Sequence, residues 1–427
     1  MPKTAPIASP STATEAEAEG GPPKFPSLAG LGAEEAVGRV AAFAVQSRCS
    51  DLFLASEADH LKISVRQLGT VREVARVPVD LGRRFISHLK ATAGMDLTER
   101  RRPLDGRWIF DGRESGNAVE MRINIVPTLH GEDMAIRMLD RESQLYDLTH
   151  LGLEPEQHDQ VLSMLDSPGG LILLAGPTGS GKTATIYACV QHLNDGNHKI
   201  NTIEDPIEFA LPGVRQSQVN LAIKLGFHDL LRAILRQSPD VIVVGEIRDR
   251  ETAQTAVHAA NAGHLVLATV HASSAAAGPQ SLRALDVHTP FLASSLRGVI
   301  SQRLVRTLCP NCKTPFDVAD VPHVFDEVKR WLKPGEGKTL YAPRGCEICE
   351  GRGYTARTGV FEVMPISAPL RNAIADAGPA ADLRRIAIDQ GLPQFRQAAL
   401  LKVAKGQTST DEVFRAIPSE QLGELDE

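Results

Sequence analysis

The stretch from Gly176 to Thr183, which reads GPTGSGKT, constrains the fold of this chain more than any other. It follows the apolar run 171–175 and precedes a helical pattern, the context that the spacing G-x-x-x-x-G-K-[ST] requires of a phosphate-binding loop. Glycines let backbone N–H groups close on phosphate oxygens, and the following helix directs its positive end at the same anion. We therefore predict a binding loop for ATP, made of Gly176, Pro177, Thr178, Gly179, Ser180, Gly181, Lys182 and Thr183.

Two side chains of this loop have predicted roles. The ammonium group of Lys182 reaches the β- and γ-phosphates, and the hydroxyl group of Thr183 binds Mg²⁺. A glycine-rich turn that matches the motif by chance is the alternative interpretation. The strand before the loop and the helix after it disfavour that alternative.

Length, charge and hydropathy limit the class of protein. A chain of 427 residues predicts about three domains. Its net charge of −6 disfavours a protein that coats nucleic acid, so no nucleic-acid partner is expected. No apolar run approaches the ~20 residues that span a bilayer, and the N-terminus lacks the apolar core of a signal peptide. We expect a cytoplasmic protein whose residues 1–32, poor in large apolar side chains, form a disordered tail.

The segment that follows this tail has mixed periodicity. Residues 34–46 and 83–93 have helical patterns, whereas residues 119–125 alternate strictly between apolar and polar. These patterns predict a small α+β domain on a mostly antiparallel sheet. Its many arginines, Arg107 and Arg122 among them, are either a solvated basic face or a set offered to a phosphate on a neighbouring unit.

The chain after the phosphate-binding loop alternates between short buried runs and helical patterns. We expect strands at runs 199–203, 241–244 and 264–271. Run 241–244 is a strand rather than a helix because it is short, β-branched and bracketed by Pro239 and Gly245, and run 264–271 follows the helix stop at Gly263. The resulting βαβα order predicts an α/β fold with a parallel sheet covered on both faces.

Acidic residues follow two of these predicted strands. Glu204 follows run 199–203, and Glu246 follows run 241–244 after a single glycine. Because ligands bind at the carboxyl ends of parallel strands, we expect both carboxylates on the nucleotide side. We predict that Glu204 polarises the attacking water and that Glu246 acts on Mg²⁺ or its water. Ordinary exposed strand ends are the alternative interpretation.

Two histidines, His264 and His271, bracket the run 264–271. With a period of two they point to opposite faces of a straight strand, so they cannot both bind the same ligand. We expect one or both to read the nucleotide state across an interface, with a purely structural role as the alternative.

Four cysteines form two CxxC pairs separated by 33 residues. In a chain that has the character of a cytosolic protein, this pattern favours a metal site over disulfides. Four thiolates suit a closed tetrahedral zinc site with no catalytic role, and unpaired buried cysteines are the alternative. The predicted ligands of Zn²⁺ are Cys309, Cys312, Cys346 and Cys349.

Several motifs together resemble the ATPases of type II secretion and type IV pilus assembly, over about residues 51–412. They are far more specific in combination than the phosphate-binding loop by itself. Besides GPTGSGKT they are TIEDPIEF (202–209), RQSPDVIVVGEIRDRETA (236–253), AGHLVLATVH (262–271), FLASSLRGVISQRLVRTLCPNC (291–312) and RTGVFEVMPIS (357–367).

The resemblance implies a homo-hexameric, RecA-like ATPase motor. The preceding domain, PAS-like in this family, then brings Arg107 of the DGR motif and Arg122 of MRINI to the nucleotide of a neighbouring subunit. The histidine box implies a role for His271 at the nucleotide. The implied partners are an inner-membrane platform protein and a cytoplasmic adaptor, which hold the motor at the inner membrane. The tetracysteine module favours the assembly and secretion branch over the retraction branch.

The predicted division of the chain has five parts. Departures from the family pattern at Phe53, at Leu104 and after His271 keep open a regulatory scaffold that binds nucleotide with little turnover. A nucleic-acid motor is disfavoured by the acidic charge. The parts are a tail (1–32), an α+β domain (33–145), a RecA-like core (146–305), a zinc module (306–362) and a C-terminal helical region (363–427).

Overall fold

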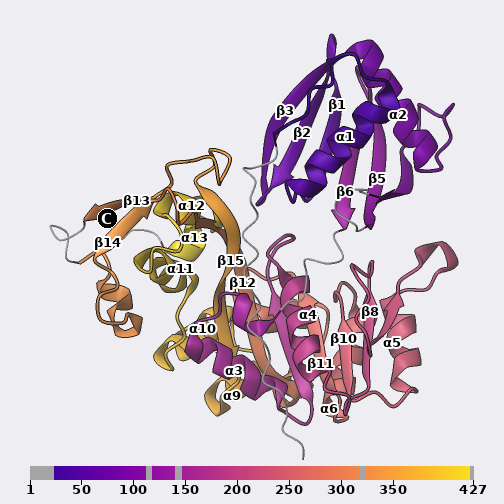
Figure 1. Cartoon of the computed structure of the whole chain (residues 1–427). Helices are drawn as coiled ribbons and strands as arrows, with labels where there is room; N and C mark the ends of the chain where they lie inside the picture. The colour runs from indigo at the N-terminus through magenta and orange to yellow at the C-terminus, as the bar shows by residue number, and fades with distance from the viewer. Residues whose placement is uncertain (1–23, 112–117, 140–146, 318–322, 424–427) are drawn as a thin grey trace, which may run out of the picture.

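The computed structural model describes residues 24–111, 118–139, 147–317 and 323–423. Its N-terminal domain packs two helices, α1 and α2, on one face of an antiparallel six-stranded sheet of order β3-β2-β1-β6-β5-β4 (Figure 1). The elements are α1 (Ala33–Gln46), β1 (Asp51–Ser56), β2 (His60–Gln67), β3 (Thr70–Pro78), α2 (Val79–Thr92), β4 (Leu104–Asp111), β5 (Ala118–Thr128) and β6 (Gly131–Leu139).

Alternation along β5 shows how the sequence builds this domain. Val119, Met121 and Ile123 are buried against the helices, so the intervening side chains, Arg122 among them, lie on the opposite face. The predicted α+β domain on an antiparallel sheet is therefore confirmed.

The predicted disordered tail is wrong at its C-terminal end. Leu28 is buried in the core of the N-terminal domain, and the ring of Phe25 lies 5.1 Å from that of Phe43 in an edge-to-face contact. These two apolar side chains pack against the core that contains α1, so residues 24–32 belong to the domain. The rest of the expected tail lies outside the described residues.

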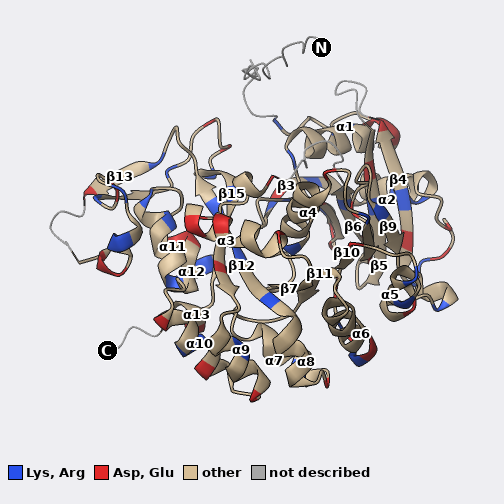
Figure 2. Cartoon of the chain, turned by 90° about the horizontal axis from the view of Figure 1, so that it is seen from below, with Lys and Arg blue, Asp and Glu red and all other residues tan. Residues whose placement is uncertain are grey.

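The central domain contains a seven-stranded sheet of order β15-β12-β7-β11-β10-β8-β9. All neighbours are parallel except the edge strand β15, which is antiparallel to β12. Apolar cores on both faces bury it, and the strands β7, β10 and β11 carry no charged side chains (Figure 2). The strands are β7 (Gly170–Ala175), β8 (Ile200–Glu204), β9 (Arg215–Gln218), β10 (Val241–Val244), β11 (Leu265–Val270), β12 (Leu296–Leu308) and β15 (Tyr354–Pro365).

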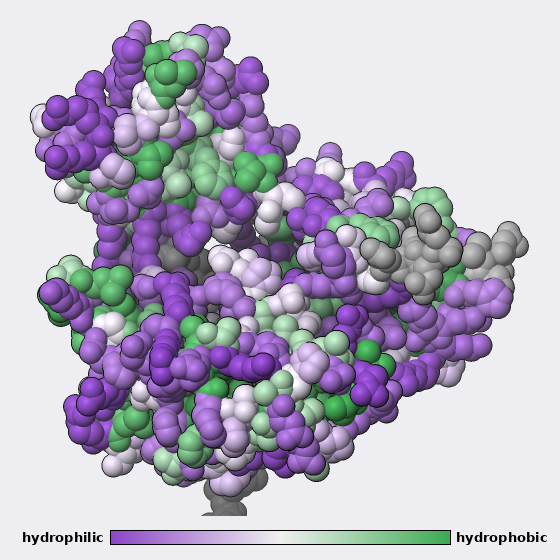
Figure 3. Space-filling view, turned by 180° about the vertical axis from the view of Figure 1, so that it is seen from behind, coloured by the Kyte–Doolittle hydropathy of each residue, from purple (hydrophilic) through white to green (hydrophobic). Residues whose placement is uncertain are grey.

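Helices cover this sheet on both sides, which confirms the predicted α/β class. On the rear of the molecule, a recess lies between the N-terminal domain and the central domain (Figure 3). The α-helices between the N-terminal domain and β12 are α3 (Pro155–Leu165), α4 (Lys182–Leu193), α5 (Phe227–Leu235), α6 (Arg250–Asn261), α7 (Gly278–Ala284) and α8 (Thr289–Ser295).

The cysteine-containing segment is inserted between the paired strands β12 and β15, and the helices that end the chain follow β15. A separate apolar core joins α11 to this segment and to the last helices. The remaining elements are β13 (Thr314–Asp317), β14 (Thr339–Ala342), α9 (Ala368–Ala375), α10 (Ala380–Asp389), α11 (Phe395–Ala404), α12 (Thr410–Ala416) and α13 (Ser419–Leu422).

Candidate nucleotide-binding site

The phosphate-binding loop joins the buried strand β7 to helix α4. Its glycines are required by the backbone, since Gly176 has φ 149°, Gly179 has φ 78° and Gly181 has φ 93°. A Cβ atom on Gly176 would lie 2.6 Å from the Oγ of Ser180. The loop is therefore a tight cradle at the N-terminus of α4, where backbone N–H groups and the helix dipole favour an anion.

The polar side chains of the loop fit a phosphate ligand. The Nζ of Lys182 donates hydrogen bonds to the carbonyl oxygens of Gly176, at 2.7 Å, and Pro177, at 2.9 Å. Burial lowers the pKa of Lys182, against the opposing effect of the Glu246 carboxylate. The buried Oγ of Ser180 has no hydrogen-bond partner among the described residues, whereas Thr178 and Thr183 are exposed on the loop.

Glu246 lies just beyond the end of β10 and forms two ion pairs. Its Oε1 lies 2.5 Å from the Nε2 of His271, and its Oε2 lies 2.5 Å from a guanidinium nitrogen of Arg248. Burial raises the pKa of this carboxyl, but Arg248 and His271 outweigh burial and lower it overall. The carboxylate is therefore held charged, and the sequence did not single out Arg248 as its partner.

Glu204, the last residue of β8, is buried and accepts three side-chain hydrogen bonds. The donors are Tyr187 on α4, Thr202 at 2.5 Å and Gln216 at 3.0 Å. Burial, followed by the bond to Glu204, raises the pKa of Tyr187 above its ordinary value. Sequence reasoning missed Tyr187, because only the packing of α4 beside β8 brings it to this carboxylate.

The two histidines lie at opposite ends of β11. His264 precedes the strand and bonds through Nδ1 to the carbonyl oxygen of Pro239 at 2.9 Å. His271 follows the strand and reaches Glu246 at the edge where the phosphate-binding loop lies. The geometry brings His271, but not His264, to the predicted site.

The predicted arginines form part of a row across the N-terminal sheet. Arg107, Arg122 and Arg137 are register neighbours on β4, β5 and β6, so their side chains lie on one face. Arg107 pairs with Glu120 at 2.8 Å. Arg122 donates to the carbonyl oxygen of Ile207, in the acidic segment of its own chain, at 3.5 Å. Arg137, which belongs to the same arginine-rich cluster in the sequence, pairs with Asp51 at 3.2 Å.

Four thiol groups form a cluster in the inserted segment, with all Sγ atoms within 4.8 Å of one another. The contacts Cys309–Cys346, Cys312–Cys349 and Cys346–Cys349 measure 3.9, 3.8 and 3.8 Å. Zinc bonded tetrahedrally to four sulfurs at about 2.3 Å places them about 3.8 Å apart. The backbone N–H of Gly353 also donates to the Sγ of Cys349 at 3.1 Å. The donor set fits a closed zinc centre.

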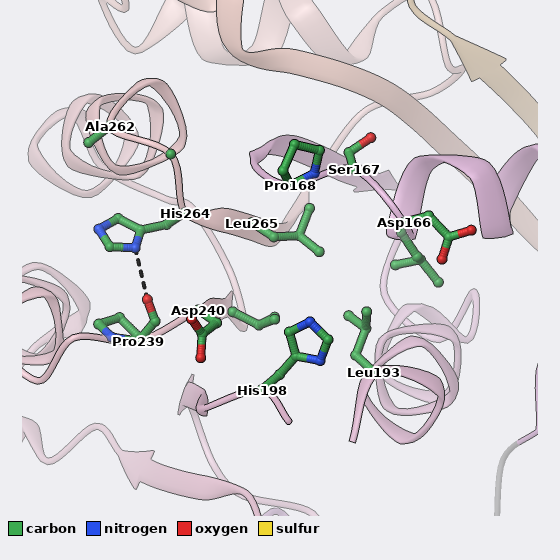
Figure 4. Close-up of a pocket in the computed structure, with 13 residues that line it drawn as sticks. Asp166, Ser167, Pro168, Leu193, His198, Pro239, Asp240, Ala262, His264 and Leu265 are labelled. Atoms are coloured by element: carbon green, nitrogen blue, oxygen red, sulfur yellow. Dashed lines mark hydrogen bonds between the residues drawn. The ribbon is translucent and has the colours of Figure 1, made fainter. Parts of the chain in front are cut away.

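A pocket of about 530 Å³ lies at the amino ends of the central strands, opposite the phosphate-binding loop. Figure 4 shows His198, Asp240 and His264 around it, with His264 bonded to Pro239. Among the residues that line it, only His264 was considered for the nucleotide site from the sequence, and the pocket is distinct from that site. Among the described residues, no helix has the length and apolar character needed to cross a membrane.

Comparison with known sequences gives consistent matches. The family described as "Type II/IV secretion system protein" matches residues 33–415. The chain is 40% identical over 377 residues to type II secretion system protein E of Dickeya dadantii, covering 88% of this chain and 74% of that protein. It is 37% identical over 370 residues to the type IV pilus assembly ATPase PilB of Myxococcus xanthus, covering 87% of this chain and 65% of that protein.

Comparison with solved structures supports the fold. The Legionella pneumophila ATPase DotB matches with a TM-score of 0.66 at 20% identity, covering 92% of this chain and 97% of that chain. The pilus retraction motor PilT with bound ADP matches with a TM-score of 0.58 at 24% identity, covering 90% of this chain and 97% of that chain. At these identities the structural matches show the shared fold.

Proposed function

Because the chain belongs to the family of type II/IV secretion system proteins, we propose that it is a hexameric ATPase motor. It hydrolyses ATP to ADP and phosphate and powers assembly of a type IV pilus or of a type II secretion pseudopilus. The observation that carries this proposal is one edge of the central sheet. There, the phosphate-binding loop, Glu246 and His271 meet at the carboxyl ends of parallel strands.

Each side chain at this edge has a proposed role in hydrolysis. Lys182 and the loop amides bind the phosphates of ATP, while Thr183 and Glu246 hold Mg²⁺, which supplies charge neutralisation when bound. Glu204 orients the attacking water. His271, paired with Glu246 at 2.5 Å, responds to the nucleotide state.

The arginine row supports a ring of subunits. Arg107, Arg122 and Arg137 lie directly opposite one another on neighbouring strands, where like charges repel. Arg107 pairs with Glu120 and Arg137 with Asp51, whereas Arg122 donates to the carbonyl oxygen of Ile207. An anion brought by a neighbouring subunit is a further counterpart for this set. The row lies on a domain separate from the phosphate-binding loop. We propose that Arg107 and Arg122 serve the nucleotide of an adjacent subunit, with Arg122 also close to the acidic segment of its own chain.

We propose a separate role for each predicted part of the chain. Residues 33–145 supply arginines, residues 146–305 hydrolyse ATP, residues 306–362 bind zinc, and residues 363–427 complete the helical end. We propose that the motor acts on the cytoplasmic face of the inner membrane through a platform protein and a cytoplasmic adaptor, and that it binds no nucleic acid.

Steady-state ATP turnover by the purified protein tests this proposal. We expect Lys182→Ala and Glu204→Gln to abolish turnover, and Arg107→Ala to impair it only in the assembled ring. Lys338→Ala, a change at an exposed lysine of the inserted segment, is the matched control and should behave as wild type. Normal turnover in Lys182→Ala would refute the proposed site. Tight ATP binding with negligible turnover in the wild type would favour a regulatory scaffold instead.

Mass measurement with and without nucleotide tests the ring independently. A species of six chains is expected in the presence of nucleotide, and a strictly monomeric protein under all conditions would refute the hexamer.

A further inference from the structure

Strand β12 extends beyond the end of its neighbour β7. The two strands remain paired as far as Ser301 and Ala175, after which β7 gives way to the phosphate-binding loop. Beyond that point, β12 carries Gln302 and Arg303 beneath the nucleotide site. Both are almost fully buried, at 1% and 4% exposure, although a polar side chain is costly to bury without partners.

Gln302 holds the phosphate-binding loop from below. Its Nε2 donates to the carbonyl oxygen of Ser180 at 2.7 Å, and its Oε1 accepts from the hydroxyl of Thr185 at 2.7 Å. Its backbone oxygen lies 2.9 Å from the position that a Cβ atom on Gly176 would take. One side chain thereby fixes the loop relative to the first turn of α4.

Arg303 holds the segment that follows β11. One of its guanidinium nitrogens donates to the carbonyl oxygen of Ser273 at 2.8 Å, and the other donates to that of Gln302 at 2.8 Å. Ser273 lies two residues after His271, the partner of Glu246. Arg303 therefore supports the residue proposed to respond to the nucleotide.

Glu362 on β15 connects the same segment to helix α11. Its Oε2 accepts a hydrogen bond from the backbone N–H of Ala275 at 2.8 Å, and its Oε1 accepts one from that of Phe395 at 3.1 Å. Phe395 is the first residue of α11, and its ring lies 4.9 Å from the guanidinium carbon of Arg303. One buried carboxylate thus joins the histidine segment to the C-terminal helices.

We propose that Gln302, Arg303 and Glu362 are positioning residues, each of which holds a different part of the nucleotide site in place. Gln302 sets the phosphate-binding loop. Arg303 and Glu362 couple the position of His271 to α11 and, through it, to the core shared with the inserted segment. The buried Nε of Arg303 has no partner among the described residues, so this guanidinium can gain a bond when the segment moves. The inference rests on the proposed ATPase function.

Separate measurements of nucleotide affinity and of the turnover rate test these roles. Gln302→Ala should raise the Kd of a non-hydrolysable ATP analogue about tenfold or more. Arg303→Lys keeps the charge but cannot reach both carbonyl oxygens, and Glu362→Gln can accept through only one oxygen. These two variants should lower kcat by up to about 100-fold with little change in Kd, since a small displacement of a catalytic group has effects of this size.

Arg306→Lys is the matched control on the same strand. Arg306 stacks on Tyr354 and pairs with Glu412, away from the phosphate-binding loop and the histidine segment. This variant should lower the midpoint of thermal unfolding and leave kcat unchanged. Wild-type kcat in both Arg303→Lys and Glu362→Gln, with a wild-type protein that turns over ATP, would overturn the inference.

Hydrogen exchange tests the connection to α11 without requiring hydrolysis. We expect the analogue with Mg²⁺ to slow amide exchange at the start of α11 in the wild type, and Arg303→Lys to abolish that difference. An equal nucleotide effect in the variant, or none in the wild type with the analogue bound, would contradict the coupling. A wild type with the exchange difference but no turnover would refute the motor and still support the coupling.

Discussion

At the scale of single residues, the two carboxylates of the site are held in different ways. Glu246 is flanked by two basic side chains, whereas Glu204 is 5% exposed and accepts its hydrogen bonds from neutral donors. A buried carboxylate depends strongly on each donor, because an unpaired charge in this environment is costly. Two of the donors reach Glu204 from other elements of the fold, Tyr187 from α4 and Gln216 from β9.

The change Tyr187→Phe removes this donor without changing the shape of the side chain. We expect the free energy of unfolding to fall by about 1.5–3 kcal/mol, the range for a hydrogen bond to a charged group. Urea unfolding of the central domain measures it. Tyr341→Phe is the matched control, since the hydroxyl of Tyr341 has no hydrogen bond within the part of the chain that the structure describes. Equal losses in the two variants would contradict a special role for Tyr187.

Sequence reasoning reached the residues of this site that belong to local motifs. Lys182, Glu204 and Glu246 follow buried runs at strand ends, and the short-range pattern is sufficient to place them. Tyr187, Arg248 and Gln302 could not be assigned in the same way. The partners of Tyr187 and Gln302 lie on other elements of the fold, so their roles depend on tertiary contacts. Arg248 pairs with Glu246, only two residues before it, and the pattern of buried runs carries no signal for that local contact.

At the scale of elements, helix α12 is attached to β12 by one buried carboxylate. Glu412 is fully buried and contacts guanidinium nitrogens of Arg306 and Arg415, at 2.6 Å in both cases. It also accepts the backbone N–H of Arg306 at 2.9 Å. The docking of α12 is therefore electrostatic as well as apolar.

The change Glu412→Gln leaves Arg306 partly buried without a counter-charge. We expect the free energy of unfolding to fall by about 3–5 kcal/mol, the loss typical when one partner of a buried ion pair is removed. Chemical denaturation of the full chain measures it. Glu420→Gln, at an exposed position of α13, should change stability by less than about 0.5 kcal/mol. A similarly small effect of Glu412→Gln would show that apolar packing suffices.

The carboxyl group of Glu412 also predicts that the free energy of unfolding depends on pH. Burial raises the pKa of Glu412, but Arg415 and Arg306 outweigh it, so the pKa in the folded state lies below the ordinary value of 4.5. The folded state then binds fewer protons than the unfolded state, and the stabilisation is present above the ordinary pKa. It is lost as the pH falls through the lowered pKa. The difference in unfolding free energy between wild type and Glu412→Gln should therefore shrink as the pH falls below about 4.5.

Elements differ in how well their sequences predict them. The run that forms β10 was predicted because it is short, β-branched and bracketed by Pro239 and Gly245, and the run that forms β11 because it is apolar and follows the helix stop at Gly263. The edge strand β3 and the long strand β12 were not predicted. β3 is largely exposed with charged residues along it, and the polar residues of β12 are satisfied only by distant partners.

At the scale of the whole molecule, the N-terminal domain contacts the segment that carries the cysteine cluster. Arg72 on β3 pairs with Glu350 at 2.6 Å, and Glu350 directly follows Cys349 of that cluster. This ion pair is partly buried, with the Glu350 side chain 13% exposed. Binding of the proposed zinc would therefore also position a contact for the N-terminal domain.

Removal of the proposed zinc should loosen both the cysteine-containing segment and its contact with the N-terminal domain. We expect one zinc per chain by metal analysis and, after chelation, faster proteolytic cleavage between residues 309 and 353. Small-angle scattering should then report a larger radius of gyration as the N-terminal domain separates. Arg72→Ala should cause the same separation while retaining zinc. Metal well below one per chain, with four titratable thiols in the folded protein, would refute the zinc centre.

Strand β12 carries both Arg303, beneath the phosphate-binding loop, and Leu308, which directly precedes Cys309 of the cysteine cluster. The strand stays paired with β15 along this length, with one register shift between Thr307 and Leu308, and the N–H of Leu308 also donates to the carbonyl oxygen of Gln407 in the C-terminal region. One strand thus joins the candidate nucleotide site to the cysteine cluster. In the proposed ring, movement at Arg303 is passed along β12 toward the cysteine cluster, and the register shift before Leu308 is the point on this path where the pairing is interrupted.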